Sequence, residues 1–188
     1  SPDLPYRNDP HGIGTLDLGR SIDPKRIAES LEGSLSRMRL DAVDIFYLPS
    51  ISRRETALHE PYLEAYQALK RQGKARFIGV ATHSHEPEVV RAAVESNAWD
   101  VVLAAFNFRQ RHRDEVRAAF REAADAGLGV VAMKTQAGVY WDDRRTRKIN
   151  MKAALKWVLE DEHVHTAIPA FSNFDQLRED LEVMRDPV

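Results

Sequence analysis

The chain has 188 residues, of which 43% are hydrophobic and 30% are charged, and its formal net charge is −2. This balance excludes a disordered chain, and the even spread of Lys and Arg gives no basic patch for nucleic acid. The absence of cysteine excludes disulfides, thiolate nucleophiles and Cys-ligated metals. No apolar run approaches the ~20 residues of a membrane span, so we expect a cytoplasmic protein without a membrane or nucleic-acid partner.

The apolar pattern divides the chain into an irregular amino-terminal segment, residues 1–23, and one domain, residues 24–188. Within the domain, short apolar runs alternate with segments whose apolar residues recur at helical spacing. The expected strands are residues 43–48, 76–81, 101–106, 129–133 and 165–169. The expected helices begin near Pro24, Tyr62, Glu86, Asp114, Met151 and Asn173.

Four residues at the ends of these helices are typical helix boundaries. Asp23 before a proline predicts a helix start, and Asn173 can cap the last helix. Gly73 and Gly127 are expected to end two of the helices.

Five strands that alternate with helices predict an α/β domain. The strands are mostly continuous apolar runs, which is typical of strands covered on both faces. Repeated βα units imply parallel pairing with right-handed crossovers. An open doubly wound sheet and a barrel both fit, and the pattern alone slightly favours the open sheet, because five strands are too few to close a parallel barrel.

Three segments, taken in order and spacing, resemble the aldo-keto reductases. Residues 30–38 and 41–45 are similar to the family's Ser-Leu-x-x-Ser-Leu-x-Arg-Leu helix and the Asp-Tyr-Val-Asp-Leu of strand four. Residues 69–80 resemble the Gly-Lys-Val-Arg-x-Ile-Gly-Val entry into strand five. Residues 167–180 resemble Ile-Pro-Gly and the Gln-Leu-x-Glu-Asn helix that follows strand eight.

The resemblance covers residues 24–185 and implies a partial (β/α)8 TIM barrel, with five parallel strands and their helices, from strand four to strand eight. A complete barrel needs roughly 250 residues. We therefore expect strands one to three to lie before Ser1, as a missing amino-terminal half-barrel.

The resemblance also implies NAD(P)H-dependent reduction of a small-molecule carbonyl substrate, with NADP or NAD as the cofactor. The family's catalytic Tyr, Asp and Lys belong to the first barrel segments, outside this stretch. A histidine normally closes strand four, but Pro49 stands there and has no donor. We therefore expect no catalytic residue and no metal site in this chain, which would be incomplete or inactive alone.

The resemblance places the cofactor contacts at the ends of strands five to eight. Thr82 could donate to the nicotinamide amide, Asn107 follows strand six, and Met133 replaces a stacking tyrosine. The other expected cofactor-binding residues are Lys134, Ser172, Asn173, Gln176, Glu179 and Asp180. Ala170 and Gln176 occupy the usual basic positions for the 2′-phosphate, which weakens the case for NADPH more than for NADH. Glu179 and Asp180 could instead be plain exposed helix residues.

Two other functions remain open from the sequence. A non-catalytic relative used for binding or assembly is suggested by Pro49, Met133, Ala170 and Gln176. Alternatively, Lys134 could form a Schiff base with a carbonyl compound if it were desolvated at its strand end.

The remaining polar candidates and the sheet edges lead to separate expectations. His83 and His85 lack a third metal ligand at an evident spacing and are expected to be loop residues, and His112 is expected to be solvated. Five parallel strands would leave two open edges and an uncovered inner face. We therefore expect a longer native protein, a homo-oligomer that closes the sheet, or a poorly soluble fragment.

Overall fold

The computed structural model describes residues 24–138, 140–142, 144 and 146–185, so the expected irregular segment 1–23 lies outside the described residues. The described chain forms a five-stranded sheet in the order β1-β2-β3-β4-β5, and each neighbouring pair is parallel. All five expected strands are confirmed within one residue at each end. They are β1 (Val43–Leu48), β2 (Ala75–Thr82), β3 (Val101–Ala105), β4 (Gly129–Met133) and β5 (Thr166–Ile168).

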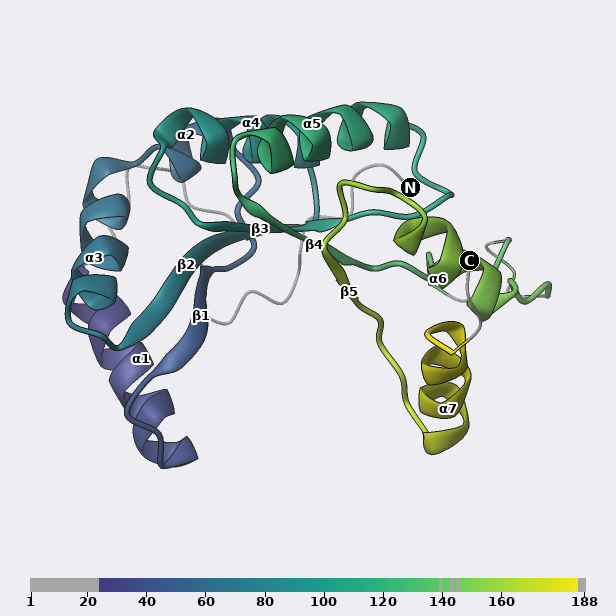
Figure 1. The fold of residues 1–188 in the computed structure, drawn as a ribbon, viewed down its shortest axis with the longest axis horizontal. Helices are drawn as coiled ribbons and strands as arrows, with labels where there is room; N and C mark the ends of the chain where they lie inside the picture. Colours follow the sequence, from purple (N-terminus) through teal and green to yellow (C-terminus); the bar gives the residue numbers. More distant parts are fainter. Residues whose placement is uncertain (1–23, 139, 143, 145, 186–188) are drawn as a thin grey trace.

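The helices lie on the outer, convex side of the curved sheet, and Figure 1 shows no described helix on the concave side. They are α1 (Pro24–Met38), α2 (Arg54–Ala57), α3 (Glu60–Arg71), α4 (Glu86–Ser96), α5 (Arg113–Asp125), α6 (Met151–Leu159) and α7 (Phe174–Val183). Only α2 is unexpected, because four residues are too few to show a periodic apolar pattern. None of the described helices is long and apolar enough to cross a membrane.

Strand order decides between the two architectures that the sequence leaves open. In a doubly wound sheet the strand order reverses and helices cover both faces. Here each strand pairs with the next one along the chain, and the helices lie on one face. The arrangement is that of consecutive units of a (β/α)8 barrel, so the open doubly wound alternative is wrong.

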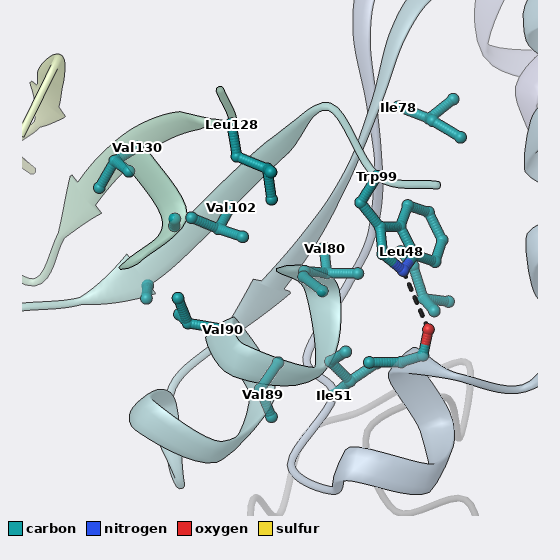
Figure 2. Packing of buried hydrophobic residues seen from close by; sticks show 14 of the residues in the cluster. Leu48, Ile51, Ile78, Val80, Val89, Val90, Trp99, Val102, Leu128 and Val130 are labelled. Atoms are coloured by element: carbon teal, nitrogen blue, oxygen red, sulfur yellow. Dashed lines mark hydrogen bonds between the residues drawn. The ribbon is translucent and has the colours of Figure 1, made fainter. Parts of the chain in front are cut away.

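The hydrophobic core lies between the convex face of the sheet and the helices. Alternate strand residues point into it, because successive side chains of a strand face opposite sides. Figure 2 shows Val89 and Val90 of α4 in this layer, together with Trp99, whose Nε1 donates to the carbonyl of Ala57 at 2.9 Å. The buried strand residues of the layer are Leu48, Ala75, Ile78, Val80, Val102, Ala104, Val130 and Ala132.

The concave face carries the other strand residues and is exposed only in part. Ile45, Phe77 and Ile168 are 36%, 38% and 50% exposed, whereas Val101 and Val131 in the middle strands are 7% and 8% exposed. The expectation of an uncovered inner face therefore holds toward the sheet edges and is wrong for the middle. Curvature brings the inward side chains of neighbouring strands together, so that the central ones shield one another.

Two helix ends and one helix start lie where the sequence predicts them. Gly73 and Gly127 come directly after the C-cap residues of α3 and α5 with φ of +72° and +85°, the left-handed region that glycine adopts without a steric penalty. Asn173 caps α7 as expected, since its Oδ1 accepts from the backbone N–H of Gln176 at 2.9 Å. Asn150 caps α6 in the same manner, which was not expected.

A partly buried carboxylate, directly before β3, joins the middle of β2 to α3. Asp100 accepts from Lys70 Nζ at 2.6 and 2.7 Å through its two oxygens. Its Oδ2 also accepts from the backbone N–H of Ile78 at 2.9 Å. One side chain therefore joins a helix to two strands, and removing it leaves two donors without an acceptor.

Asp100→Ala should lower the free energy of unfolding by ~1–3 kcal/mol, because the Ile78 N–H and the Lys70 ammonium lose their acceptor. Urea denaturation followed by circular dichroism measures the change. Glu122→Ala, which removes the partner of the exposed Arg91, is the matched control and should cost less than ~1 kcal/mol. Equal losses in the two variants would contradict the role given to Asp100.

Candidate functional site

The carboxyl ends of the five strands lie along one edge of the sheet, as the sequence predicts. The register pairs Thr82 with Ala104, Ala105 with Met133, and Met133 with Ile168. In barrels of this kind, the loops at this end build the functional site. The expected cofactor positions that end or follow β2, β3 and β4 are therefore neighbours, and we call this edge the mouth.

Asn107 ties the loop after β3 to the loop after β4. Its Nδ2 donates to the carbonyl of Lys134 at 3.2 Å, and its Oδ1 accepts from the backbone N–H of Arg109 at 3.1 Å. The residue is 8% exposed. Because an amide nitrogen carries two hydrogens, Asn107 is held in one orientation and keeps a second hydrogen for a further acceptor.

Thr82 is buried at the end of β2, and its hydroxyl is engaged within a local turn. Oγ1 donates to the carbonyl of Ser84 at 2.6 Å and accepts from the backbone N–H of Ser84 at 3.3 Å. A hydroxyl has one hydrogen, so Thr82 could donate to a cofactor amide only if this turn opened. The expected contact stays a prediction, and this geometry counts against it.

Met133 and Lys134 stand side by side in the chain but differ in environment. Met133 faces the concave side, because the preceding Ala132 belongs to the helix-facing core, and it is 7% exposed. Its thioether gives the mouth an apolar surface. Lys134 is exposed, with φ of +57°. A Schiff-base lysine needs desolvation, which this position does not provide.

Pro49 lies at the mouth directly after β1, where the resemblance expects a histidine. It is exposed and offers neither an N–H nor a side-chain donor. The chain then returns toward β2, where the backbone N–H of Ile51 donates to the carbonyl of Ala81 at 3.0 Å. Pro49 therefore cannot orient a carbonyl group by hydrogen bonding.

Three of the expected cofactor residues form a local network at the start of α7. Gln176 Oε1 accepts from the backbone N–H of Ser172 at 2.6 Å, and Asn173 Oδ1 accepts from that of Gln176. Both side chains thus accept hydrogen bonds from backbone N–H groups at or just before the start of α7. The positive end of the helix dipole lies here, and it favours an anion.

Asp180 of α7 is buried against the loop after β4. Its Oδ1 accepts from Gln136 Nε2 at 2.7 Å, and both residues are 7% exposed. Burial raises the pKa of Asp180, the Gln136 bond opposes this, and the Glu179 charge adds to it. Asp180 is therefore not a plain exposed helix residue. Its Oδ2 and Thr135 Oγ1 are buried without a hydrogen-bond partner in the described part of the chain.

Glu86, the first residue of α4, is a buried acceptor that the sequence pattern did not predict. Its side chain is 3% exposed, accepts from Gln110 Nε2 at 3.0 Å and lies 2.8 Å from His112 Nε2. His112 is exposed, as expected, and its imidazole also contacts this buried carboxylate. His83 lines the adjoining cavity of about 790 Å³. Burial lowers the pKa of His83, the Lys134 charge lowers it further, and Glu86 acts in the opposite direction.

The missed residues have partners in a different βα unit. Glu86 and His112 are 26 positions apart, and Gln136 and Asp180 are 44 apart. An acidic residue at the first position of a helix is favoured by the helix dipole alone. No signal in the local sequence therefore distinguishes the buried Glu86 from an exposed one.

The mouth fits a nicotinamide dinucleotide in part. Met133 supplies an apolar surface, Asn107 a donor, and the start of α7 a place for a phosphate. Ala170 and Gln176, however, carry no charge where a 2′-phosphate would need a cation.

Asp180→Asn should stabilise the fold at neutral pH, because the amide keeps an acceptor for Gln136 and removes a buried charge. The folded-state pKa of Asp180 is raised. Its stabilising contribution is therefore complete below the pKa of the unfolded chain and is lost as the pH rises through the folded-state pKa. Thermal unfolding at several pH values tests this. The advantage of the variant should shrink toward acid pH, and an advantage that is independent of pH would refute the assignment.

The chain is similar in sequence to proteins of one known family. A model of the Aldo/keto reductase family matches residues 15–153. The uncharacterized oxidoreductase YrpG of Bacillus subtilis (strain 168) is 29% identical over 121 residues, which are 63% of this chain and 36% of YrpG. This chain thus spans about a third of the length of that curated relative.

Solved structures resemble the chain in fold. A protein of Pseudomonas aeruginosa assigned to the aldo-keto reductases superposes with a TM-score of 0.67 at 17% identity, covering 88% of this chain and 63% of that one. The thermostable aldo-keto reductase Tm1743 gives a TM-score of 0.67 at 20% identity, covering 88% of this chain and 62% of its own. The family model matches more than half of the residues of this chain, and the chain therefore belongs to the aldo/keto reductase family.

Proposed function

We propose that this chain forms the cofactor-binding side of a carbonyl reductase that uses NADH or NADPH. Family membership supports the proposal, and one observation carries it. Asn107 and Met133 are adjacent at the mouth, where the backbone N–H of Phe106 donates to the carbonyl of Met133 at 2.9 Å. A nicotinamide cofactor, when bound, would supply the hydride that reduces a small-molecule carbonyl substrate.

The two residues would act on different parts of the nicotinamide. Met133 is nearly buried and would cover one ring face by dispersion, with less directional preference than an aromatic ring. Asn107 would use its second amide hydrogen to orient the carboxamide oxygen. Because Asn107 is already fixed by the loops after β3 and β4, little side-chain entropy would be lost on binding.

The proton that accompanies the hydride needs an acid, and neither Pro49 nor Tyr47 of the first strand suits that role. Pro49 has no proton to give. Tyr47 lies on the concave side, close to Gly79, and burial raises its pKa. An acid that works near neutral pH needs a lowered tyrosine pKa. We therefore propose that the family's Tyr, Lys and Asp belong to further βα units, of the same polypeptide or of a partner subunit.

Those units would pair with the edge strands β1 and β5. Apolar side chains exposed near these edges, such as Ile45 and Ile168, would then be covered. The chain by itself would bind the cofactor and would not turn over a carbonyl compound. Oxidation of NADH by the purified chain with a small aldehyde would contradict this part of the proposal.

NADH should bind the chain at least as tightly as NADPH, because Ala170 and Gln176 offer no cation to the 2′-phosphate. Ala170→Arg places a guanidinium at an exposed position and should tighten NADPH binding about tenfold, with NADH affected less than about twofold. Titration followed by nicotinamide fluorescence measures both. Ala126→Arg, which adds the same charge at the exposed end of α5, should leave both affinities unchanged.

A non-catalytic relative is the second candidate function. The Thr82 hydroxyl is engaged by Ser84, and the Asp180 carboxylate is engaged by Gln136, so two expected cofactor contacts serve the fold itself. The same titration separates the two functions. If neither dinucleotide binds, the reductase proposal fails and the non-catalytic reading is favoured.

A further inference from the structure

The rim of the mouth carries a second cavity, built from side chains that play no part in the proposed cofactor contacts. It measures about 220 Å³ and lies between the loops after β3 and β4 and α6. Its lining residues are Phe108, Trp141, Ile149, Asn150, Ala153, Ala154 and Trp157. Three of these seven are aromatic, and none is charged.

The floor of the cavity is rigid. Trp157 packs on Phe106 with ring centroids 4.9 Å apart, and the guanidinium of Arg117 lies 5.3 Å from the Trp157 ring. Ile149 and Ala154 are buried. These contacts fix the Trp157 ring before any ligand arrives, so binding need not order it.

One side of the cavity is formed by an aromatic pair that lies on the two loops. Trp141 meets Phe108 edge to face at 5.0 Å and is still 47% exposed. The backbone N–H of Trp141 donates to the carbonyl of Arg147 at 2.9 Å, and Arg109 donates to the carbonyl of Tyr140. The loop thus keeps a large apolar ring in contact with water, at a cost that a bound apolar group would offset.

From these contacts we propose that the cavity binds a neutral compound with one aromatic ring. Apolar cavities of ~150 Å³ accept benzene, so the space suffices for a substituted single ring. Aromatic pairs add an orientation-dependent attraction to area burial, and three rings line this space. Apart from the N–H groups of the two tryptophans, Asn150 has the one polar side chain of the lining, and its Oδ1 already accepts from the Ala153 N–H at 3.0 Å. Its Nδ2 would accommodate a ligand oxygen, and a charged ligand would find no counter-ion among the lining residues.

Titration with benzyl alcohol and with cyclohexylmethanol tests the site, with tryptophan emission as the readout. Two of the chain's three tryptophans line the cavity, and the third, Trp99, is buried in the core between the sheet and the helices. Benzyl alcohol should saturate and bind about fivefold more tightly than the saturated analogue. Absence of saturation, or equal affinity for the two compounds, would overturn the proposal.

Ala153→Leu supplies the decisive variant. Ala153 is exposed and lines the cavity, so leucine fills the space without entering the core and keeps a good helix former in α6. It should weaken benzyl alcohol binding at least tenfold. Ala118→Leu makes the same change on α5 beside a polar cavity and should leave binding within about twofold. Unaltered binding in Ala153→Leu would show that benzyl alcohol binds elsewhere.

Discussion

Backbone pairing between parallel strands is the constraint on which both faces of this domain depend. In a strand the side chains alternate, so a shift of one residue in register would exchange the two faces completely. The observed register turns Ala132 toward the helices and Met133 toward the concave side. The same backbone hydrogen bonds thus decide which side chains face the apolar core and which face the mouth. A change of register would alter both sets at once.

Gly79 shows how tightly this register is held. A Cβ at this position would lie 2.6 Å from the carbonyl oxygen of Val101 and 2.8 Å from the Tyr47 ring. The neighbouring strands therefore approach so closely that no side chain fits between them. The glycine in the Ile-Gly-Val sequence of β2, which supported the family resemblance, has this packing reason.

The fold could be predicted from the sequence because its signals are local. Apolar runs gave the five strands, and Gly73, Gly127 and Asn173 gave helix ends that depend on a few neighbouring residues. The short helix α2 and the buried middle of the concave face could not be predicted in this way. A four-residue helix has no period, and the exposure of Val131 depends on curvature, which is a property of the whole sheet.

For the candidate site, chain order predicted which residues stand at the strand ends but not what they touch. Asn107 and Met133 were expected at the mouth and lie there. Thr82 was expected to face a ligand, but its hydroxyl bonds to Ser84 two residues away. Partners such as Gln136 for Asp180 come from another unit of the fold, and no local pattern encodes a pairing across 44 positions.

Carboxylates at the two ends of the sheet have different partners, and this bears on the proposed cofactor binding. Near the amino ends of the strands, Asp100 is neutralised by Lys70. At the mouth, Asp180 accepts from the amide of Gln136, which satisfies an oxygen but cancels no charge. Glu86 accepts from the amide of Gln110 and also lies 2.8 Å from the His112 imidazole. A dinucleotide is an anion, so a charged Asp180 would oppose it. The raised pKa of Asp180 reduces that repulsion, because burial favours the neutral carboxyl. Binding of a dinucleotide near α7, as proposed, should therefore raise this pKa further, and its affinity would then depend on the protonation of Asp180.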